Sequence, residues 1–120
     1  MKTIIHVDNS AFFRKVMKTF IAEQGYTIES FDSGANALEQ INSGNVCLVI
    51  TGLSLADMRG EELIKKIITS PITVPIITVT SNQGETQMQK LKLLGVKATL
   101  LKSGPWRDQL LPYLQEYVPY

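Results

Sequence analysis

The stretch VITGLSLADMRG, residues 49–60, joins an apolar segment to a polar loop. Its start belongs to an apolar run over residues 47–50, which soon gives way to a glycine, Gly52. A short apolar run bounded by turn residues is typical of a strand buried on both faces in a parallel sheet. In such sheets, ligands bind beyond the carboxyl ends of the strands. The residues that follow this strand therefore decide what the site can do.

Apolar runs of strand length recur along the chain, at residues 3–7, 26–31, 46–50, 75–79 and 97–101. Between them, apolar residues repeat at helical spacing, at Phe13, Val16, Met17, Phe20 and Ile21, at Ala37, Leu38 and Ile41, at Leu63, Ile64, Ile67 and Ile68, at Met88, Leu91 and Leu94, and at Trp106, Leu110, Leu114 and Tyr117. The alternation predicts an α/β fold, in which helices cover both faces of a doubly wound, five-stranded parallel sheet of the flavodoxin-like (βα)5 type.

The ends of the expected helices carry capping residues. Ser10 and Ser33 stand where N-caps belong. Left-handed C-terminal residues are expected at Gly25, Gly44 and Gly95. The last helix contains Pro112, which removes a backbone hydrogen bond, so we expect this helix to bend or to start late.

Composition excludes several classes of protein. The 120 residues fit a single domain, residues 1–120, and 44% hydrophobic content is too apolar for a disordered chain. With 12 basic and 11 acidic residues, the chain lacks the cationic surface that binds nucleic acid or anionic membranes directly. Cys47 is expected to be a small buried hydrophobic residue. No apolar run approaches the length of a membrane span, so we expect a cytoplasmic protein.

Polar side chains follow four of the expected strands. Asp8 and Asn9 come after the first strand, Gly52 with its polar loop after the third, Thr80 after the fourth and Lys102 after the fifth. Because the carboxyl ends of parallel strands meet at one edge of the sheet, we expect these positions to converge.

Four segments, IIHVDNSAFFRKVM, GYTIESFDSGANALEQI, VPIITVTS and LGVKATLLKS, together resemble the receiver domain of two-component response regulators, over nearly the whole chain. A flavodoxin-like binder of flavins or nucleotides would instead carry a Gly- or Thr-rich phosphate loop after the first strand. The segment DNSAFF contains no glycine. A small-molecule binder that uses the same cleft remains a less favoured hypothesis.

The resemblance implies a reaction and assigns its residues. In the family, a phosphoryl group moves from a partner's phosphohistidine to an Asp that ends the third strand. Here Asp8 matches one member of the acidic pair that holds Mg²⁺, Thr80 matches the hydroxyl that bonds the phosphoryl oxygens, and Lys102 matches the cation. Gly52 falls on the acceptor position, and Asn9 replaces the second acid.

Three further positions depart from the family pattern. Arg59 replaces an acid in the loop LADMRG, Thr99 stands where a switch aromatic is usual, and Ser103 replaces a proline. Asp57 lies in the same loop, five residues beyond the acceptor position, and is expected to be a solvated loop carboxylate rather than an acceptor.

These departures have chemical consequences. Glycine has no side chain, so no acyl phosphate can form at Gly52. Asp8 alone supplies a carboxylate for Mg²⁺, so we expect weak metal binding or none, and no other cofactor. Asp8 and Lys102 are interpreted either as a structural ion pair or as a remnant anion or metal site. Thr80 either caps the next turn or recognises phosphate.

Five other residues are candidates for the site, the core or an interface. His6 is expected to be a neutral, hydrogen-bonded core histidine, because no second histidine accompanies it. Thr51 and Ser54 flank Gly52, but no base is evident beside them to make either an acceptor. Phe12 is a candidate interface residue near the top of the first helix, where kinases and phosphotransfer proteins dock in receivers. Trp106 is expected to cover the sheet edge or to serve an interface.

The sequence therefore predicts an atypical receiver, or pseudo-receiver, of a two-component or phosphorelay system. It is expected not to be an enzyme, not to be phosphorylated at the usual site, and to act by protein–protein interaction. Its partner would be a kinase, a phosphotransfer protein, an output domain or a second copy in a homodimer, without direct nucleic-acid or membrane binding. The alternative is a functional phosphorelay receiver whose acceptor has been mutated or displaced.

Overall fold

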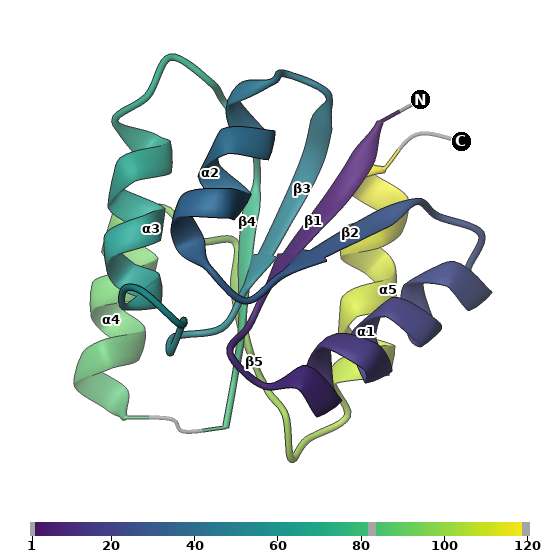
Figure 1. The fold of residues 1–120 in the computed structure, drawn as a ribbon. Helices are drawn as coiled ribbons and strands as arrows, with labels where there is room; N and C mark the ends of the chain where they lie inside the picture. The colour runs from purple at the N-terminus through teal and green to yellow at the C-terminus, as the bar shows by residue number, and fades with distance from the viewer. Residues whose placement is uncertain (1, 82–83, 119–120) are drawn as a thin grey trace.

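A five-stranded parallel sheet lies between two layers of helices (Figure 1). The computed structural model describes residues 2–81 and 84–118. Strand and helix alternate along the chain as β1 (Thr3–Val7), α1 (Ala11–Glu23), β2 (Ile28–Phe31), α2 (Gly34–Asn42), β3 (Val46–Thr51), α3 (Gly60–Ile68), β4 (Ile76–Thr80), α4 (Glu85–Leu94), β5 (Ala98–Leu101) and α5 (Trp106–Tyr117). The strands are ordered β2-β1-β3-β4-β5, which confirms the predicted doubly wound fold.

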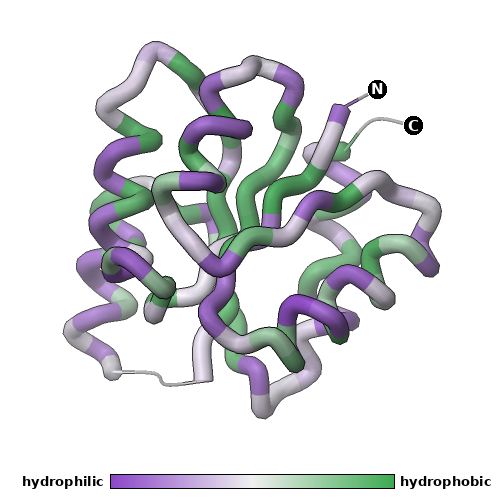
Figure 2. Tube along the Cα trace, viewed as in Figure 1, coloured by the Kyte–Doolittle hydropathy of each residue, from purple (hydrophilic) through white to green (hydrophobic). Residues whose placement is uncertain are grey.

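Each face of the sheet has its own apolar core, because successive side chains of a strand point to opposite faces. The α1 and α5 side buries Phe13, Met17, Phe20, Ile21, Trp106, Leu110 and Leu114 against Ile4, Leu48, Ile50, Ile77 and Val79. The other side buries Ala37, Ile41, Leu63, Ile64, Ile67 and Leu91, from α2, α3 and α4, against Ile5, Val7, Val49 and Ile76. In Figure 2 most of the length of the central strands is accordingly hydrophobic.

The expected caps are present, and two strands are shorter than the apolar runs. The Ser10 hydroxyl accepts a hydrogen bond from the Phe13 N–H at 3.1 Å. Left-handed φ values occur at Gly25, Gly44 and Gly95, as expected. β2 begins at Ile28 rather than at residue 26, because the Tyr26 N–H still donates to the Ile21 carbonyl of α1. β5 likewise begins at Ala98.

The helix α5 is continuous through Pro112 and begins at Trp106, so, of the two expected outcomes, a bend or a late start, the late start is wrong. Its apolar stripe is buried, and this packing stabilises the helix despite the backbone hydrogen bond that Pro112 cannot make.

Trp106 is part of the core, not of the surface. It is only 3% exposed, and its ring makes edge contacts with Phe13 and Phe20, at centroid distances of 5.2 and 5.5 Å. Of the two roles expected for Trp106, cover of the sheet edge or an interface, its burial leaves little ring surface for the second. Phe12, in contrast, is 78% exposed.

No helix in the described part of the chain is long and apolar enough to cross a bilayer.

Candidate functional site

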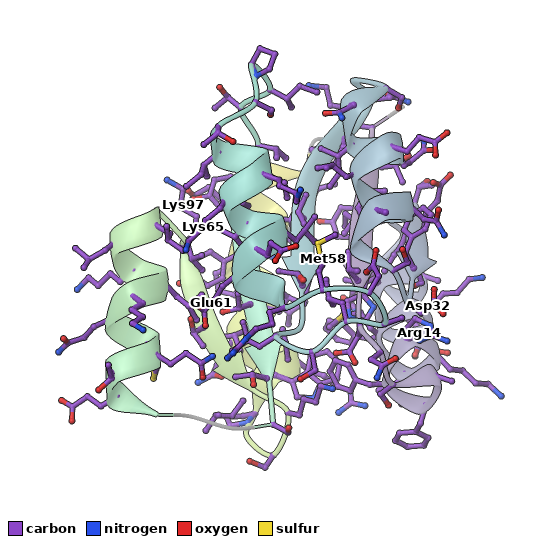
Figure 3. The ribbon with its side chains drawn as sticks, turned by 60° about the vertical axis from the view of Figure 1, so that its left-hand side comes forward. Arg14, Asp32, Met58, Glu61, Lys65 and Lys97 are labelled. Atoms are coloured by element: carbon purple, nitrogen blue, oxygen red, sulfur yellow. The ribbon has the colours of Figure 1, made fainter. Side chains whose placement is uncertain are left out.

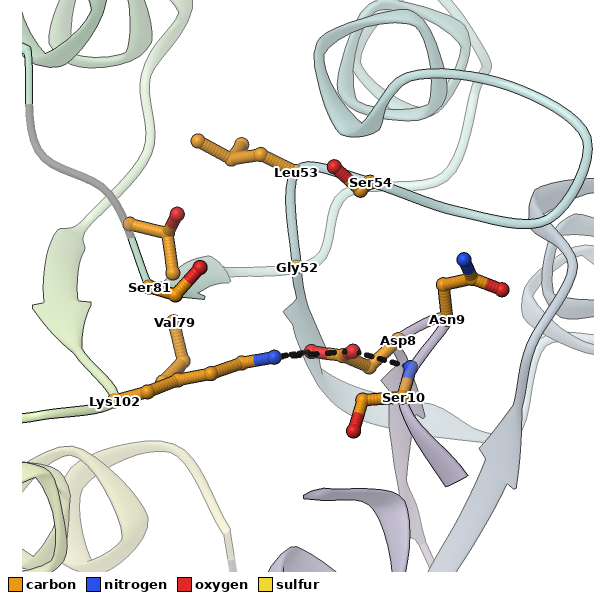
Figure 4. A pocket seen from close by; sticks show the side chains of 10 residues that line it. Asp8, Asn9, Ser10, Gly52, Leu53, Ser54, Val79, Ser81 and Lys102 are labelled. Atoms are coloured by element: carbon orange, nitrogen blue, oxygen red, sulfur yellow. Dashed lines mark hydrogen bonds and ion pairs between the residues drawn. The ribbon is translucent and has the colours of Figure 1, made fainter. Parts of the chain in front are cut away.

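A polar cleft of about 250 Å³ opens at the carboxyl edge of the sheet (Figure 4). It is lined by Asp8, Asn9, Ser10, Gly52, Leu53, Ser54, Val79, Thr80, Ser81 and Lys102. The structure thus brings together the five positions that the sequence predicted to converge. The ends of β1, β3 and β4 and the turn after β5 supply them.

Asp8 and Lys102 form an ion pair across this cleft. The Lys102 Nζ lies 2.9 Å from the Asp8 Oδ2 and 3.2 Å from its Oδ1, which also accepts the Ser10 N–H at 2.9 Å. Asp8 is 3% exposed, whereas the Lys102 side chain is 24% exposed. Lys102 also lies over the Phe13 ring, 4.4 Å from its centroid. A cation between a carboxylate and an aromatic face is held in one position.

Gly52 lies against Asp8 at the end of β3. Its N–H donates to the Val7 carbonyl at 2.8 Å, which fixes the backbone beside β1. A Cβ atom built at position 52 would lie 2.7 Å from the Asp8 Oδ2 and 3.2 Å from its Cγ. Both distances are below ordinary van der Waals contact. The Asp8 carboxylate therefore occupies space that a side chain at position 52 would need.

The remaining cleft residues contribute polar groups of different kinds. Thr80 is 6% exposed at the end of β4, and Asn9 is exposed, with its N–H donating to the Ser54 carbonyl at 3.2 Å. The Thr51 hydroxyl is buried and donates to the Gly52 carbonyl at 2.9 Å. The buried Thr51 hydroxyl is therefore a poor substitute acceptor for a phosphoryl group, whereas the Ser54 side chain is exposed in the cleft.

Asp57 lies outside the cleft and binds the N-terminus of α2. Its carboxylate accepts hydrogen bonds from the Gly34 N–H at 2.7 Å, the Ala35 N–H at 3.1 Å and the Ser33 hydroxyl at 3.1 Å. The Gly34 hydrogen bond is the main reason that the pKa of Asp57 is lowered. Asp57 is exposed, as expected for a loop carboxylate, but the sequence did not predict that backbone donors at the start of α2 anchor it.

The loop that carries Asp57 is fixed to α2 at two other points. Met58 packs on Gly34, where a built Cβ would lie 2.6 Å from the Met58 sulfur, and Figure 3 shows the Met58 side chain directed toward α2. The Ala56 N–H donates to the Asp32 carbonyl at 2.8 Å. We name this arrangement, made by Asp57, Met58 and Ala56 against residues 32–35, the α2 anchor.

His6 lies behind the cleft on β1 and is fully buried. Burial lowers its pKa to about 4; Asp8 opposes this shift, and Lys102 and Arg14 add to it. A neutral core histidine is therefore confirmed. The expected hydrogen bond is not found, since neither ring nitrogen has a partner within residues 2–81 and 84–118; the ring instead packs 5.8 Å from the Phe13 ring, centroid to centroid.

The other departures from the family pattern lie outside the cleft. The Thr99 hydroxyl accepts a hydrogen bond from the Thr78 hydroxyl at 2.7 Å, which ties β5 to β4. Arg59 forms an isolated β-bridge with Ser54 ahead of α3, and Ser103 is exposed.

The cleft is a poor match for a divalent cation. Mg²⁺ favours carboxylates in octahedral geometry, and the single carboxylate here, Asp8, already contacts Lys102 and the Ser10 N–H. Across the described ranges, no three His, Cys, Asp or Glu side chains gather in a way that could hold a metal ion.

Fold and site together define a flavodoxin-like α/β domain with an acid, a hydroxyl and a cation at the carboxyl edge of its sheet. The model of the response regulator receiver domain family matches residues 4–113. The chain belongs to this family. Receiver domains are signalling domains that interact with kinases, phosphotransfer proteins or output domains.

Individual relatives agree with this assignment. The two-component response regulator ORR5 of Oryza sativa subsp. japonica is 29% identical over 102 residues, covering 82% of this chain and 76% of that protein. The two-component response regulator ORR7 of the same subspecies is 30% identical over 102 residues, covering 82% of this chain and 49% of that protein.

Solved structures share the fold at lower identity. A CheY-like receiver domain protein from Methanospirillum hungatei JF-1 has a TM-score of 0.85 at 23% identity and covers 97% of this chain and 92% of its own. The BeF3-activated receiver domain of Klebsiella pneumoniae RstA has a TM-score of 0.88 at 18% identity, and the match covers 99% of this chain and 100% of that chain.

Proposed function

We propose that this chain is a receiver domain that takes no phosphoryl group at position 52 and signals through protein contacts, without enzymatic activity. The position of the Asp8 carboxylate is the main support for this proposal. Its carboxylate lies where a side chain at position 52 would stand, and glycine supplies no carboxylate of its own. An acyl phosphate needs a carboxylate nucleophile, so the family's reaction has no acceptor at this point.

The charge arrangement of the cleft supports the same conclusion. Lys102 contacts both oxygens of Asp8 and the face of Phe13. To neutralise an incoming phosphoryl group, Lys102 would have to leave Asp8, which is buried and would lose its cation. We interpret the pair as structural: it holds β1 and the turn after β5 together.

The same pair disfavours metal binding. A cation at Asp8 would have to displace the Lys102 ammonium, and Asn9 would offer it only a neutral amide. Weak Mg²⁺ binding or none is the consequence that we propose.

Signalling in the cytoplasm would then depend on surfaces rather than on phosphate. Phe12 is one exposed aromatic side chain that a protein partner can bury, since such residues often anchor interfaces. We propose that the partner that buries Phe12 is a kinase, a phosphotransfer protein or an output domain.

Intact-mass analysis after incubation with acetyl phosphate and Mg²⁺ tests the proposal. The expected result is an unchanged mass, with a working receiver domain treated in parallel as the positive control. A phosphorylated species that maps to Ser54 would establish the alternative, a receiver with a displaced acceptor.

A second arm uses Gly52→Asp. We expect no adduct or only a trace, because Asp8 must first vacate the site and Asn9 remains neutral. Full phosphorylation with strong Mg²⁺ binding would show that the rest of the cleft is competent.

A further inference from the structure

The thioether of Met58 covers the start of α2. Gly34 has no side chain, and the Met58 Sδ, Cγ and Cε atoms lie 2.6, 2.9 and 3.0 Å from the point where a Cβ of residue 34 would stand. The same side chain packs against the apolar core beneath α2 and α3 (Figure 3). Met58 therefore fills the space that the glycine leaves open on the helix.

The Met58 side chain is also open to solvent. It is only half-buried, and it lines a hollow of about 640 Å³ together with residues of its own loop, of α3 and of the end of β4. A water molecule occupies about 30 Å³, so an oxidant as small as hydrogen peroxide can enter this hollow. Met17, in contrast, is fully buried under α1, and Met88 is half-buried on α4. Met58 is thus an accessible thioether that also makes a structural contact.

Oxidation of the sulfur changes this contact. A methionine sulfoxide is polar, and its oxygen accepts hydrogen bonds. Toward Gly34 and the core the oxygen would meet apolar groups, and a buried polar atom without a donor is costly. The oxidised side chain is therefore more stable when it turns into the hollow, which leaves Gly34 uncovered.

The loop transmits such a movement to the start of α2 and to the cleft. Asp57, the residue before Met58, accepts the Gly34 and Ala35 N–H groups, and the Met58 carbonyl accepts the Leu55 N–H at 3.1 Å. The first residues of the same loop line the cleft at the carboxyl edge of the sheet. The oxidation state of one sulfur atom is thereby linked to the helix cap and to the wall of the cleft.

We propose that Met58 is a reversible oxidation site whose sulfoxide loosens the α2 anchor. A lone pair of the thioether sulfur attacks one oxygen of hydrogen peroxide, an S–O bond forms and the O–O bond breaks. The sulfur is oxidised by two electrons, and the other oxygen leaves as water after it takes up the proton of the transferred hydroxyl group. A methionine sulfoxide reductase with a thiol reductant restores the thioether. This inference is independent of whether the cleft accepts a phosphoryl group.

Peroxide treatment of the intact chain, followed by peptide mapping and amide hydrogen exchange, tests the proposal. We expect Met58 to gain one oxygen atom under conditions that leave Met17 unmodified. Exchange at Gly34 and Ala35 should then be about fivefold faster, as for a lost helix cap, while the centre of the sheet is unaffected. Treatment with the reductase should restore the slow exchange.

Two leucine variants supply the matched comparison. Met58→Leu keeps an apolar side chain of similar volume over Gly34 but has no sulfur at this position, so peroxide should leave its exchange at Gly34 and Ala35 unchanged. Met88→Leu removes the other half-buried thioether, and peroxide should accelerate exchange in this variant as in the wild type.

Four results would overturn the proposal. They are resistance of Met58 to peroxide until the chain unfolds, oxidation of Met58 without faster exchange at Gly34 and Ala35, faster exchange that persists in peroxide-treated Met58→Leu, and faster exchange that the reductase does not reverse.

Discussion

Two aspartates, Asp8 beside the loop between β3 and α3 and Asp57 within it, are held in opposite ways. Asp8 is buried at the end of β1 and contacts the Lys102 ammonium, 2.9 Å away. Asp57 is exposed and is held by two backbone N–H groups and a hydroxyl at the start of α2. The Asp8 carboxylate lies in the cleft at the carboxyl edge of the sheet, and the Asp57 carboxylate fixes the loop whose first residues line that cleft. Each aspartate thus has a structural explanation that requires no phosphate chemistry.

Folding stability should depend on pH more through the cleft region than through the Asp57 loop, because the buried His6 lies behind Asp8. The pKa of His6 is lowered from 6.5 to about 4 in the folded protein, with burial as the largest cause. Between these values the unfolded chain binds a proton that the folded chain does not, so folding stability falls as the pH drops from 6.5 to 4. The shift corresponds to a loss of about 3 kcal/mol.

Urea unfolding of the wild type and of His6→Leu across this pH range measures the effect. The free energy of unfolding should change much less with pH in the His6→Leu variant, since leucine does not titrate. Equal slopes in both proteins would show that the folded chain accommodates a charged His6 through Asp8.

Disrupting the α2 anchor should have a smaller and more local effect on stability than protonation of His6. Asp57→Ala removes the acceptor of the Gly34 and Ala35 N–H groups, so both amides should exchange faster with solvent while the centre of the sheet is unaffected. Asp32→Ala is the matched control, because it removes the same charge nearby but keeps the backbone carbonyl that accepts the Ala56 N–H.

The pH dependence of the Asp57 effect has a defined sign. Its pKa is lowered in the folded state, so its contribution is complete above the unfolded pKa and is lost as the pH falls through the folded pKa. Wild type and Asp57→Ala should therefore converge in acid. Identical amide exchange in the two proteins at neutral pH would mean that Met58 and Ala56 alone hold the loop.

The sequence predicted the cleft better than it predicted the loop. Asp8, Thr80 and Lys102 each follow a strand of one parallel sheet, so topology alone brings them together. Asp57 caps a helix that starts more than twenty residues earlier in the chain, at Gly34, and local sequence carries no signal for such a long-range contact.

Side-chain burial was harder to predict than the fold. Phe12 and Trp106 are both aromatic residues near a helix start, yet one is 78% exposed and the other 3%. The difference depends on how α1 and α5 pack on each other, where Trp106 meets Phe13 and Phe20. His6 was correctly placed in the core, but its lack of a hydrogen-bond partner among the described residues depends on neighbours that periodicity does not identify.

The central claim is that the Asp8 carboxylate occupies the side-chain space at position 52, and a double-mutant cycle tests it most directly. The backbone of Gly52 is not left-handed, so alanine introduces no strain of its own there. Gly52→Ala should cost about 1–3 kcal/mol of unfolding free energy in the wild type and clearly less in an Asp8→Ala background, where the colliding carboxylate is gone. An equal cost in both backgrounds would contradict the claim.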